Sequence, residues 1–173
     1  MSSAGDVNGD GYYDIIIGAP RGISGDTSPK TGIAYVIFGK ASGFTNINLA
    51  NDLTTTSSGF SITGSGVSDW NGYSVSSLGD INGDGYDEIV TCGYGGDISY
   101  ATDVGECYVI YGKATGFANI NVGSLGTQGF TIIGSLEGDQ LGYSVSSAGD
   151  VNKDGFYDLV IGAVGRGVSG AGS

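Results

Sequence analysis

The sequence contains no histidine, few basic residues and no long apolar segment, and each absence excludes a class of function. Among its 173 residues there are no His and only 6 Lys and Arg. Without histidine, the chain lacks the most common general base and the usual base of a catalytic triad, so an enzyme is not expected. The basic residues are scattered, so no basic patch could bind nucleic acid. No apolar run approaches the roughly 18 residues of a membrane-spanning helix, so no membrane insertion is expected.

Proline and cysteine are also scarce, with 2 residues each, whereas glycine is abundant at 35 residues. The hydrophobic fraction of 39% is too high for a disordered chain. Many regularly spaced glycines are typical of short strands joined by tight turns. Cys92 and Cys107 fall on neighbouring predicted strands, where they could form a disulfide or remain two small buried thiols. Because no histidine and no further cysteine accompany them, they do not indicate a zinc site.

What the chain does contain is the motif Asp-x-Asn-x-Asp-Gly-x-x-Asp/Glu, three times, each time before a β-branched segment. The copies are loop 1 (residues 6–14), loop 2 (residues 80–88) and loop 3 (residues 150–158). Positions 1, 3, 5 and 9 carry side-chain oxygens, and alternate residues of a tight loop can direct such oxygens onto a hard cation. Position 6 is Gly in every copy, which permits the positive φ of a sharp turn. The three copies therefore predict three Ca²⁺ sites.

Each predicted site has four side-chain ligands and one backbone carbonyl, which belongs to position 7. The ligands are Asp6, Asn8, Asp10, Tyr12 and Asp14 in loop 1, Asp80, Asn82, Asp84, Tyr86 and Glu88 in loop 2, and Asp150, Asn152, Asp154, Phe156 and Asp158 in loop 3. An EF-hand would need a bidentate Glu at position 12 and a following helix. Position 12 is Ile17, Thr91 or Ile161, inside segments typical of buried strands, so an EF-hand is disfavoured.

Sequence similarity extends beyond the loops and defines a long internal repeat. Residues 33–44 match 106–117, residues 59–65 match 129–135, and residues 72–77 match 142–147. Each repeat has four strand signals, which we call A to D, and the acidic loop joins A to B. Four antiparallel strands per repeat are typical of a β-propeller blade. We therefore predict an all-β, incomplete β-propeller with blade 1 at 1–71 (its strand A shortened), blade 2 at 72–141, and strands A and B of blade 3 at 142–173.

These motifs resemble the FG-GAP repeat of the integrin α-subunit β-propeller and of many large bacterial surface proteins. The resemblance rests on Gly-Tyr-Ser-Val-Ser-Ser before the loop, Ile-Ile-Ile-Gly-Ala-Pro at residues 15–20 and Tyr-Val-Ile-Phe-Gly at residues 35–39. It covers essentially the whole chain. The chain departs from the pattern where Asn71 and Leu141 replace the Phe of Phe-Gly, and where Glu88 replaces the usual Asp of position 9. The last departure predicts altered geometry or affinity at the second site.

The resemblance implies a calcium-binding, non-catalytic segment used for cell adhesion or ligand binding in a secreted or surface protein. An alternative is a structural spacer, or an accessory module of a secreted enzyme such as a phospholipase D that carries FG-GAP repeats. The resemblance places the metal loops on one face, and the B–C and D–A connections on the opposite, ligand-binding face. The candidates there for contact with a protein or glycan ligand, whose identity the sequence does not reveal, are Asp69, Trp70, Tyr94, Asp97 and Tyr100.

The family closes rings of seven blades, so we expect this chain to be a fragment, with Met1 at the start of a cut segment and no signal peptide. An open propeller exposes strand edges and sheet faces, which promote association. We therefore expect a homo-oligomer, either a dimer or a trimer. Ca²⁺ should favour it by reducing the repulsion between chains of net charge −12.

Overall fold

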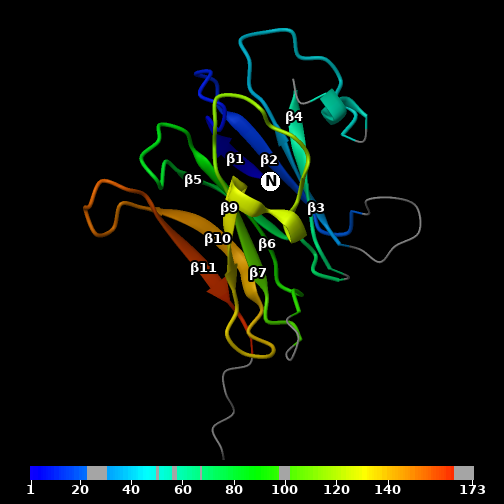
Figure 1. The fold of residues 1–173 in the computed structure, drawn as a ribbon, viewed down its shortest axis with the longest axis vertical. Helices are drawn as coiled ribbons and strands as arrows, with labels where there is room; N and C mark the ends of the chain where they lie inside the picture. The colour runs from blue at the N-terminus through cyan, green and yellow to red at the C-terminus, as the bar shows by residue number, and fades with distance from the viewer. Residues whose placement is uncertain (23–30, 50, 56–57, 67, 98–101, 166–173) are drawn as a thin grey trace, which may run out of the picture.

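The computed structural model describes residues 1–22, 31–49, 51–55, 58–66, 68–97 and 102–165, whose strands form three sheets (Figure 1). The first sheet has the order β1 (Ser2–Gly5), β2 (Asp14–Ala19), β3 (Ile33–Ile37), β4 (Gly59–Thr63) and β8 (Ile120–Asn121). The second has the order β5 (Ser74–Gly79), β6 (Glu88–Gly93), β7 (Glu106–Ile110) and β9 (Gly129–Ile133), and the third pairs β10 (Leu141–Gly149) with β11 (Asp158–Ala163). The only helices among the described residues are the short 3₁₀ turns η1 (Asp52–Thr55), η2 (Val122–Ser124) and η3 (Gly126–Gln128), and none could cross a membrane.

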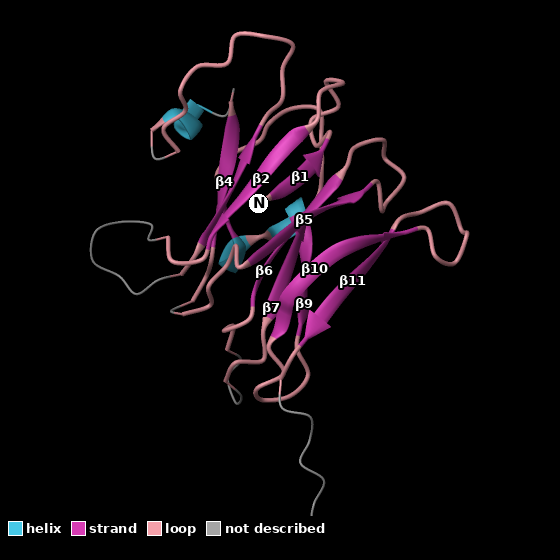
Figure 2. Ribbon diagram, turned by 180° about the vertical axis from the view of Figure 1, so that it is seen from behind, coloured by secondary structure: helices cyan, strands magenta, loops and turns pink. Residues whose placement is uncertain are grey.

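The prediction of an all-β, incomplete propeller is confirmed. Apart from β8, neighbouring strands of each sheet pair antiparallel, and the sheets follow one another without closing a ring in the described part of the chain (Figure 2). One strand was not anticipated: β8 pairs parallel with β4 although its residues belong to the segment assigned to blade 2. The connection between β7 and β9 thus crosses back onto the preceding blade. The blade boundaries at 71/72 and 141/142 stay predictions.

The hydrophobic core lies between neighbouring sheets rather than inside any one of them. One cluster joins Ile16, Val36 and Phe60 of the first sheet to Ile89 and Ile110 of the second. A second cluster joins residues of β6 and β7 to partly buried residues of β10 and β11. Strand β6, which has a neighbouring sheet on both faces, is buried along its whole length. The continuous β-branched run that predicted this strand is the pattern expected of a strand covered on both sides.

Each strand A ends in the same irregularity, which turns the chain into the acidic loop. The register shifts once between Ser3 and Gly5, and at the equivalent places in β5 and β10. The Ser hydroxyl oxygen accepts a hydrogen bond from the N–H of the Gly two residues later in all three blades. That Gly has φ of 74° at Gly5, 74° at Gly79 and 68° at Gly149, a conformation in which a side chain would be strained. This β-bulge directs all three loops to the same end of the strands.

The two cysteines are joined by a disulfide across β6 and β7. Cys92 and Cys107 face each other directly in the strand register, and their Cα atoms are 4.1 Å apart. Of the two alternatives open from the sequence, the structure contains the cross-strand bond. The bond lies beneath Gly142, where an added Cβ would come within 2.6 Å of the Cβ of Cys92. It is therefore packed at the contact between the second and third sheets.

Candidate metal centres

The three acidic loops adopt one hydrogen-bonded structure, in which the side-chain oxygens of positions 1 and 3 meet at the N–H of position 5. In loop 1 the N–H of Asp10 donates to Oδ1 of Asp6 and to Oδ1 of Asn8, at 3.0 Å each. The N–H of Gly11 donates to the other oxygen of Asp6, at 2.9 Å. The same set recurs in loop 2 and in loop 3. Position 6 has φ of 88°, 90° and 95° in the three copies, as its invariable Gly predicts.

The acid at position 9 does not join this group freely, because it also binds the body of the blade. Asp14 is buried and accepts hydrogen bonds from the N–H of Val7 at 2.9 Å and of Gly39 at 2.7 Å. Glu88 is equally buried and accepts from the N–H groups of Ile81 and Gly112. Gly39 and Gly112 are equivalent residues that follow strand C. In loops 1 and 2, position 9 therefore fixes the loop to the residue after strand C. The sequence analysis missed this role, although the repeated Phe/Tyr-Gly-Lys after strand C was an available signal.

This arrangement explains why no cluster of three or more Asp, Glu, Cys or His side chains suited to a metal occurs among the described residues. Position 3 contributes an amide oxygen rather than a carboxylate, and the position-9 acids of loops 1 and 2 accept hydrogen bonds from backbone N–H groups. The donors nevertheless fit a hard cation, because every one is an oxygen and those of positions 1 and 3 meet at a single N–H group. The ligand assignment for all three loops stays a prediction.

Burial raises the pKa of the position-9 carboxylates of loops 1 and 2. Desolvation raises the pKa of Asp14 to about 6, although the hydrogen bonds from Gly39 and Val7 offset part of the effect. Desolvation raises the pKa of Glu88 to about 7, again opposed by two backbone hydrogen bonds. Neighbouring loop carboxylates add to both shifts, because like charges disfavour ionisation. A cation in the loop would stabilise the charged forms and oppose these shifts.

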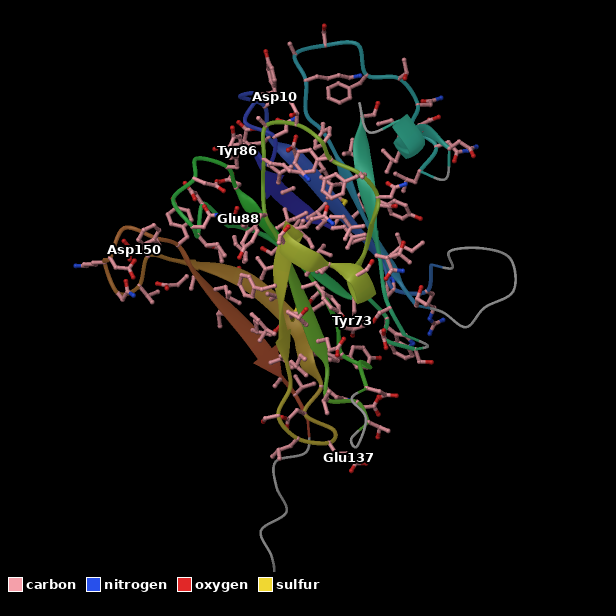
Figure 3. All side chains as sticks on the ribbon, viewed as in Figure 1. Asp10, Tyr73, Tyr86, Glu88, Glu137 and Asp150 are labelled. Atoms are coloured by element: carbon pink, nitrogen blue, oxygen red, sulfur yellow. A yellow bond between two sulfur atoms is a disulfide. The ribbon has the colours of Figure 1, made fainter. Side chains whose placement is uncertain are left out.

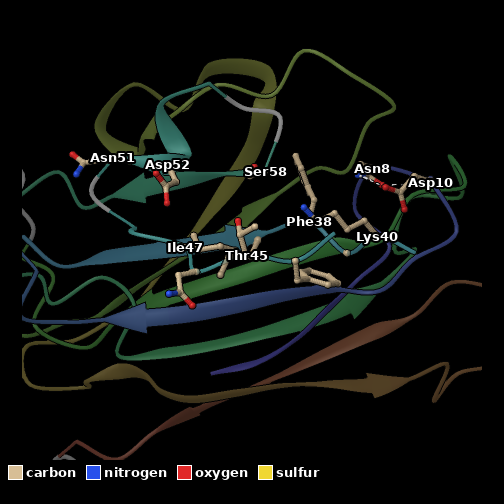
Figure 4. A pocket seen from close by; sticks show the side chains of 13 residues that line it. Asn8, Asp10, Phe38, Lys40, Thr45, Ile47, Asn51, Asp52 and Ser58 are labelled. Carbon is tan, nitrogen blue, oxygen red and sulfur yellow. Dashed lines mark hydrogen bonds between the residues drawn. The ribbon is translucent and has the colours of Figure 1, made fainter. Parts of the chain in front are cut away.

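A pocket of about 590 Å³ lies beside loop 1 and leaves its side chains open to solvent (Figure 4). Asn8 and Asp10 form one wall, where the amide of Asn8 donates to Oδ2 of Asp10 at 3.0 Å. Lys40 and Phe44, from the chain that follows β3, also line the pocket. Asp10, at position 5 of loop 1, is thus exposed at the edge of this pocket.

The loops and the aromatic candidates lie toward opposite ends of the strands. Figure 3 shows Asp10, Tyr86 and Asp150 toward one end and Tyr73 toward the other. At that second end Trp70 packs edge-on against Tyr94, with ring centroids 4.9 Å apart.

Two further tyrosines complete this aromatic cluster and were missed from the sequence. Tyr73 lies 4.5 Å from Tyr94 between ring centroids, and Tyr143 lies 5.2 Å from Tyr73. Both follow the Gly of Gly-Tyr-Ser, so the repeat itself contained the signal. Asp69, by contrast, is buried and accepts hydrogen bonds from Gly66 and Ser65, which gives it a structural role. Of the other two predicted residues, Asp97 accepts a hydrogen bond from the N–H of Asp103, and Tyr100 lies outside the described residues.

Successive antiparallel sheets, each with an acidic loop between its first two strands, define a β-propeller repeat protein. The FG-GAP repeat matches residues 2–37, 71–110 and 141–173, which is more than half of the chain. The chain therefore belongs to the FG-GAP repeat family.

Integrin α subunits are among the relatives of this chain. Integrin alpha-V of Gallus gallus is 33% identical over 165 residues, which cover 92% of this chain and 14% of the integrin. Integrin alpha-IIb of Mus musculus is 30% identical over 161 residues, with the same coverage of 92% and 14%. Integrin alpha-6 of Homo sapiens is 26% identical over 159 residues, which cover 92% of this chain and 12% of the integrin. The chain thus spans only about one seventh of the length of the first two relatives.

Proposed function

We propose that this chain is a calcium-stabilised, non-catalytic propeller segment of an extracellular or cell-surface protein that serves adhesion or ligand binding. The observation that carries the proposal is the oxygen constellation that recurs in all three loops with the same hydrogen bonds. Bound Ca²⁺ would supply positive charge that neutralises the loop carboxylates. The residues of positions 1, 3, 5 and 9 and the carbonyl of position 7 would hold it. The similarity to integrin α subunits supports the adhesive role.

The aromatic cluster at the other end of the strands is the proposed ligand-binding face. Tyr73 and Tyr143 remain substantially exposed although they pack against each other and against Tyr94. Exposed Tyr and Trp are enriched at protein interfaces, where they supply a large contact area at low entropic cost. Because the aromatic cluster lies far from the loops, we propose that calcium stabilises the fold and that the aromatic cluster contacts the ligand.

Titration calorimetry of the whole chain tests the proposed metal binding. We expect three Ca²⁺ ions per chain, with dissociation constants of roughly 0.1–1 mM, the range of extracellular modules. The variant Asp84→Ala removes the position-5 ligand of loop 2 and should bind two ions. Asp97→Ala, which removes an acid at the opposite end of the strands, is the matched control and should still bind three. Absence of Ca²⁺ binding by the wild-type chain would refute the proposed function.

Lowering the pH from 8 to 6 is expected to weaken Ca²⁺ binding in loop 2 about tenfold but in loop 1 only about twofold. Protons compete with the cation for the position-9 carboxylate, whose pKa is about 7 for Glu88 and about 6 for Asp14. Calcium titrations at a series of pH values, followed loop by loop by NMR, measure the effect. Glu88→Gln removes the titrating group and should abolish the steeper dependence of loop 2. An equal pH dependence in both loops would contradict the assignment of Glu88.

The same carboxylate should give the metal-free protein the opposite behaviour. The pKa of Glu88 rises from an ordinary value of 4.5 to about 7 on folding. Its contribution to stability is therefore complete below pH 4.5 and is lost as the pH rises through 7. Without Ca²⁺, Glu88 thus favours folding more at pH 6 than at pH 8, whereas with Ca²⁺ the higher pH favours the loaded loop.

A further inference from the structure

Loop 2 holds the backbone of loop 1 at the first predicted ligand. The N–H of Asp6 donates to Oδ2 of Asp87 at 2.8 Å, and the N–H of Asp87 donates to the carbonyl of Asp6 at 3.2 Å. A third bond from blade 2, from the N–H of Lys113 to the carbonyl of Val7, fixes the next residue at 2.9 Å. Asp87 occupies position 8 of loop 2, directly beside the position-9 acid. Both backbone groups of Asp6 are therefore held by a residue of the neighbouring loop.

The two loops are also in tight van der Waals contact. The ring of Tyr86 lies over Gly9, where an added Cβ would come within 2.6 Å of Cε1. The carboxylate of Asp87 covers Gly5 so closely that an added Cβ there would lie 2.1 Å from Oδ2. Tyr86 is the residue whose carbonyl is the predicted position-7 ligand of loop 2. These contacts place loop 2 directly against loop 1, and the hydrogen bonds of Asp87 join the two loops.

The contact between loops 2 and 3 keeps the ring packing but lacks the hydrogen-bonded clamp. Phe156 lies over Gly83 as Tyr86 lies over Gly9, with a Cε1 distance of 2.8 Å from an added Cβ. Position 8 of loop 3 is Tyr157, whose ring covers Gly79. Across residues 80–88 and 150–158, all of which are described, no hydrogen bond joins loop 3 to loop 2. The chain therefore contains a clamped pair of loops and an unclamped pair.

We propose that Asp87 is a positioning residue that couples the metal sites of loops 1 and 2, so that Ca²⁺ in either loop raises the affinity of the other. The inference rests on the proposed calcium binding. An ion in loop 2 immobilises its positions 7 to 9, and through Asp87 it orders Asp6 before loop 1 is filled. Because loop 1 is then already ordered, its Ca²⁺ ion binds without the entropic cost of ordering Asp6. The coupling free energy is the same in both directions, so Ca²⁺ in loop 1 favours binding in loop 2 equally. Loops 2 and 3, which lack the clamp, bind almost independently.

Site-resolved Ca²⁺ titration of the whole chain by ¹⁵N NMR tests the coupling. The N–H groups of Gly11, Gly85 and Gly155 bond to the position-1 carboxylate of their own loop and report each site separately. When Asp84→Ala disables loop 2, the dissociation constant of loop 1 should rise at least about fivefold. The dissociation constant of loop 3 should change less than about twofold.

Variants at position 87 identify the group responsible. Asp87→Ala removes the acceptor, so loop 1 should bind more weakly and should no longer respond to Asp84→Ala. Asp87→Asn keeps an oxygen that can accept from Asp6 and should retain the coupling, which separates the hydrogen bond from the charge. Asp97→Asn removes the same charge at the other end of the strands and should change neither loop.

The possible outcomes distinguish this inference from the function on which it rests. If no glycine signal responds to Ca²⁺, both the calcium sites and their coupling are refuted. If all three loops bind but loop 1 ignores the state of loop 2, the sites stand and the coupling falls. If coupling persists in Asp87→Ala, another contact carries it and the role assigned to Asp87 is wrong.

Discussion

Replacing Phe117 by Ala is expected to lower the free energy of unfolding by about 3–5 kcal/mol, the usual cost of emptying a buried aromatic position. Phe117 belongs to blade 2, but its ring stacks on Phe60 of blade 1 with a centroid distance of 4.8 Å and an interplanar angle of 14°. It also lies 5.2 Å from the ring of Phe38, and only 8% of its surface is exposed. The side chain thus fastens one blade to the next. Urea unfolding followed by circular dichroism measures the loss.

The repeat supplies a matched control for this variant. Phe44 holds the equivalent position in blade 1, and its ring lies 5.1 Å from Nζ of Lys40, just as that of Phe117 lies 5.1 Å from Nζ of Lys113. Phe44 is 58% exposed, so Phe44→Ala should cost less than about 0.5 kcal/mol. The Lys–Phe pairing is the same in both blades, but only the ring of Phe117 is buried, against Phe60 and Phe38 of the preceding blade. If both variants lower the free energy of unfolding equally, the contact of Phe117 with the preceding blade contributes little to stability.

Removal of calcium should lower the free energy of unfolding by a comparable amount, because the contributions of three sites add. At about 1 mM Ca²⁺, a site with a dissociation constant of roughly 0.1–1 mM stabilises the fold by about 1 kcal/mol, so full chelation should cost about 3 kcal/mol. Loops 1 and 2 contain no basic residue that could replace the cation, and Lys153 is the sole basic residue of loop 3. The expected result is a lower melting temperature in EDTA, measured by calorimetry.

Ionic strength must be separated from specific binding in this measurement. The chain has a net charge of −12, so any added salt reduces its self-repulsion. NaCl at the ionic strength of the calcium buffer is the control and should not restore the melting temperature. A melting temperature that EDTA leaves unchanged would contradict a stabilising role for the loops.

Much of the fold could be predicted because its signals are local and repeated. The strand at residues 88–93 follows from a β-branched run after an acidic turn, and β6 has these bounds. The positive φ of the position-6 glycines follows from the motif alone. The three copies of the loop predicted metal sites, since a single copy could equally be an acidic turn. The four strand signals repeated in register predicted the propeller blade. Self-association of the chain as a dimer or a trimer stays a prediction.

The contacts between blades were decided only by the tertiary structure. Asp87 and Asp6 are 81 residues apart, and no local pattern shows that position 8 of one loop reaches position 1 of the preceding one. The parallel pairing of β8 with β4, the burial of Phe117 beside an exposed Phe44, and the gathering of Tyr73 with Tyr143 depend likewise on how one sheet lies on the next. The sequence by itself determined the four strands that recur in each repeat, the loops and their oxygen donors, because these depend on residues close in the chain. The packing of sheet on sheet decided which position-9 acids are buried, which cysteines are bonded and which loops are clamped together, because each depends on groups that only folding brings within reach.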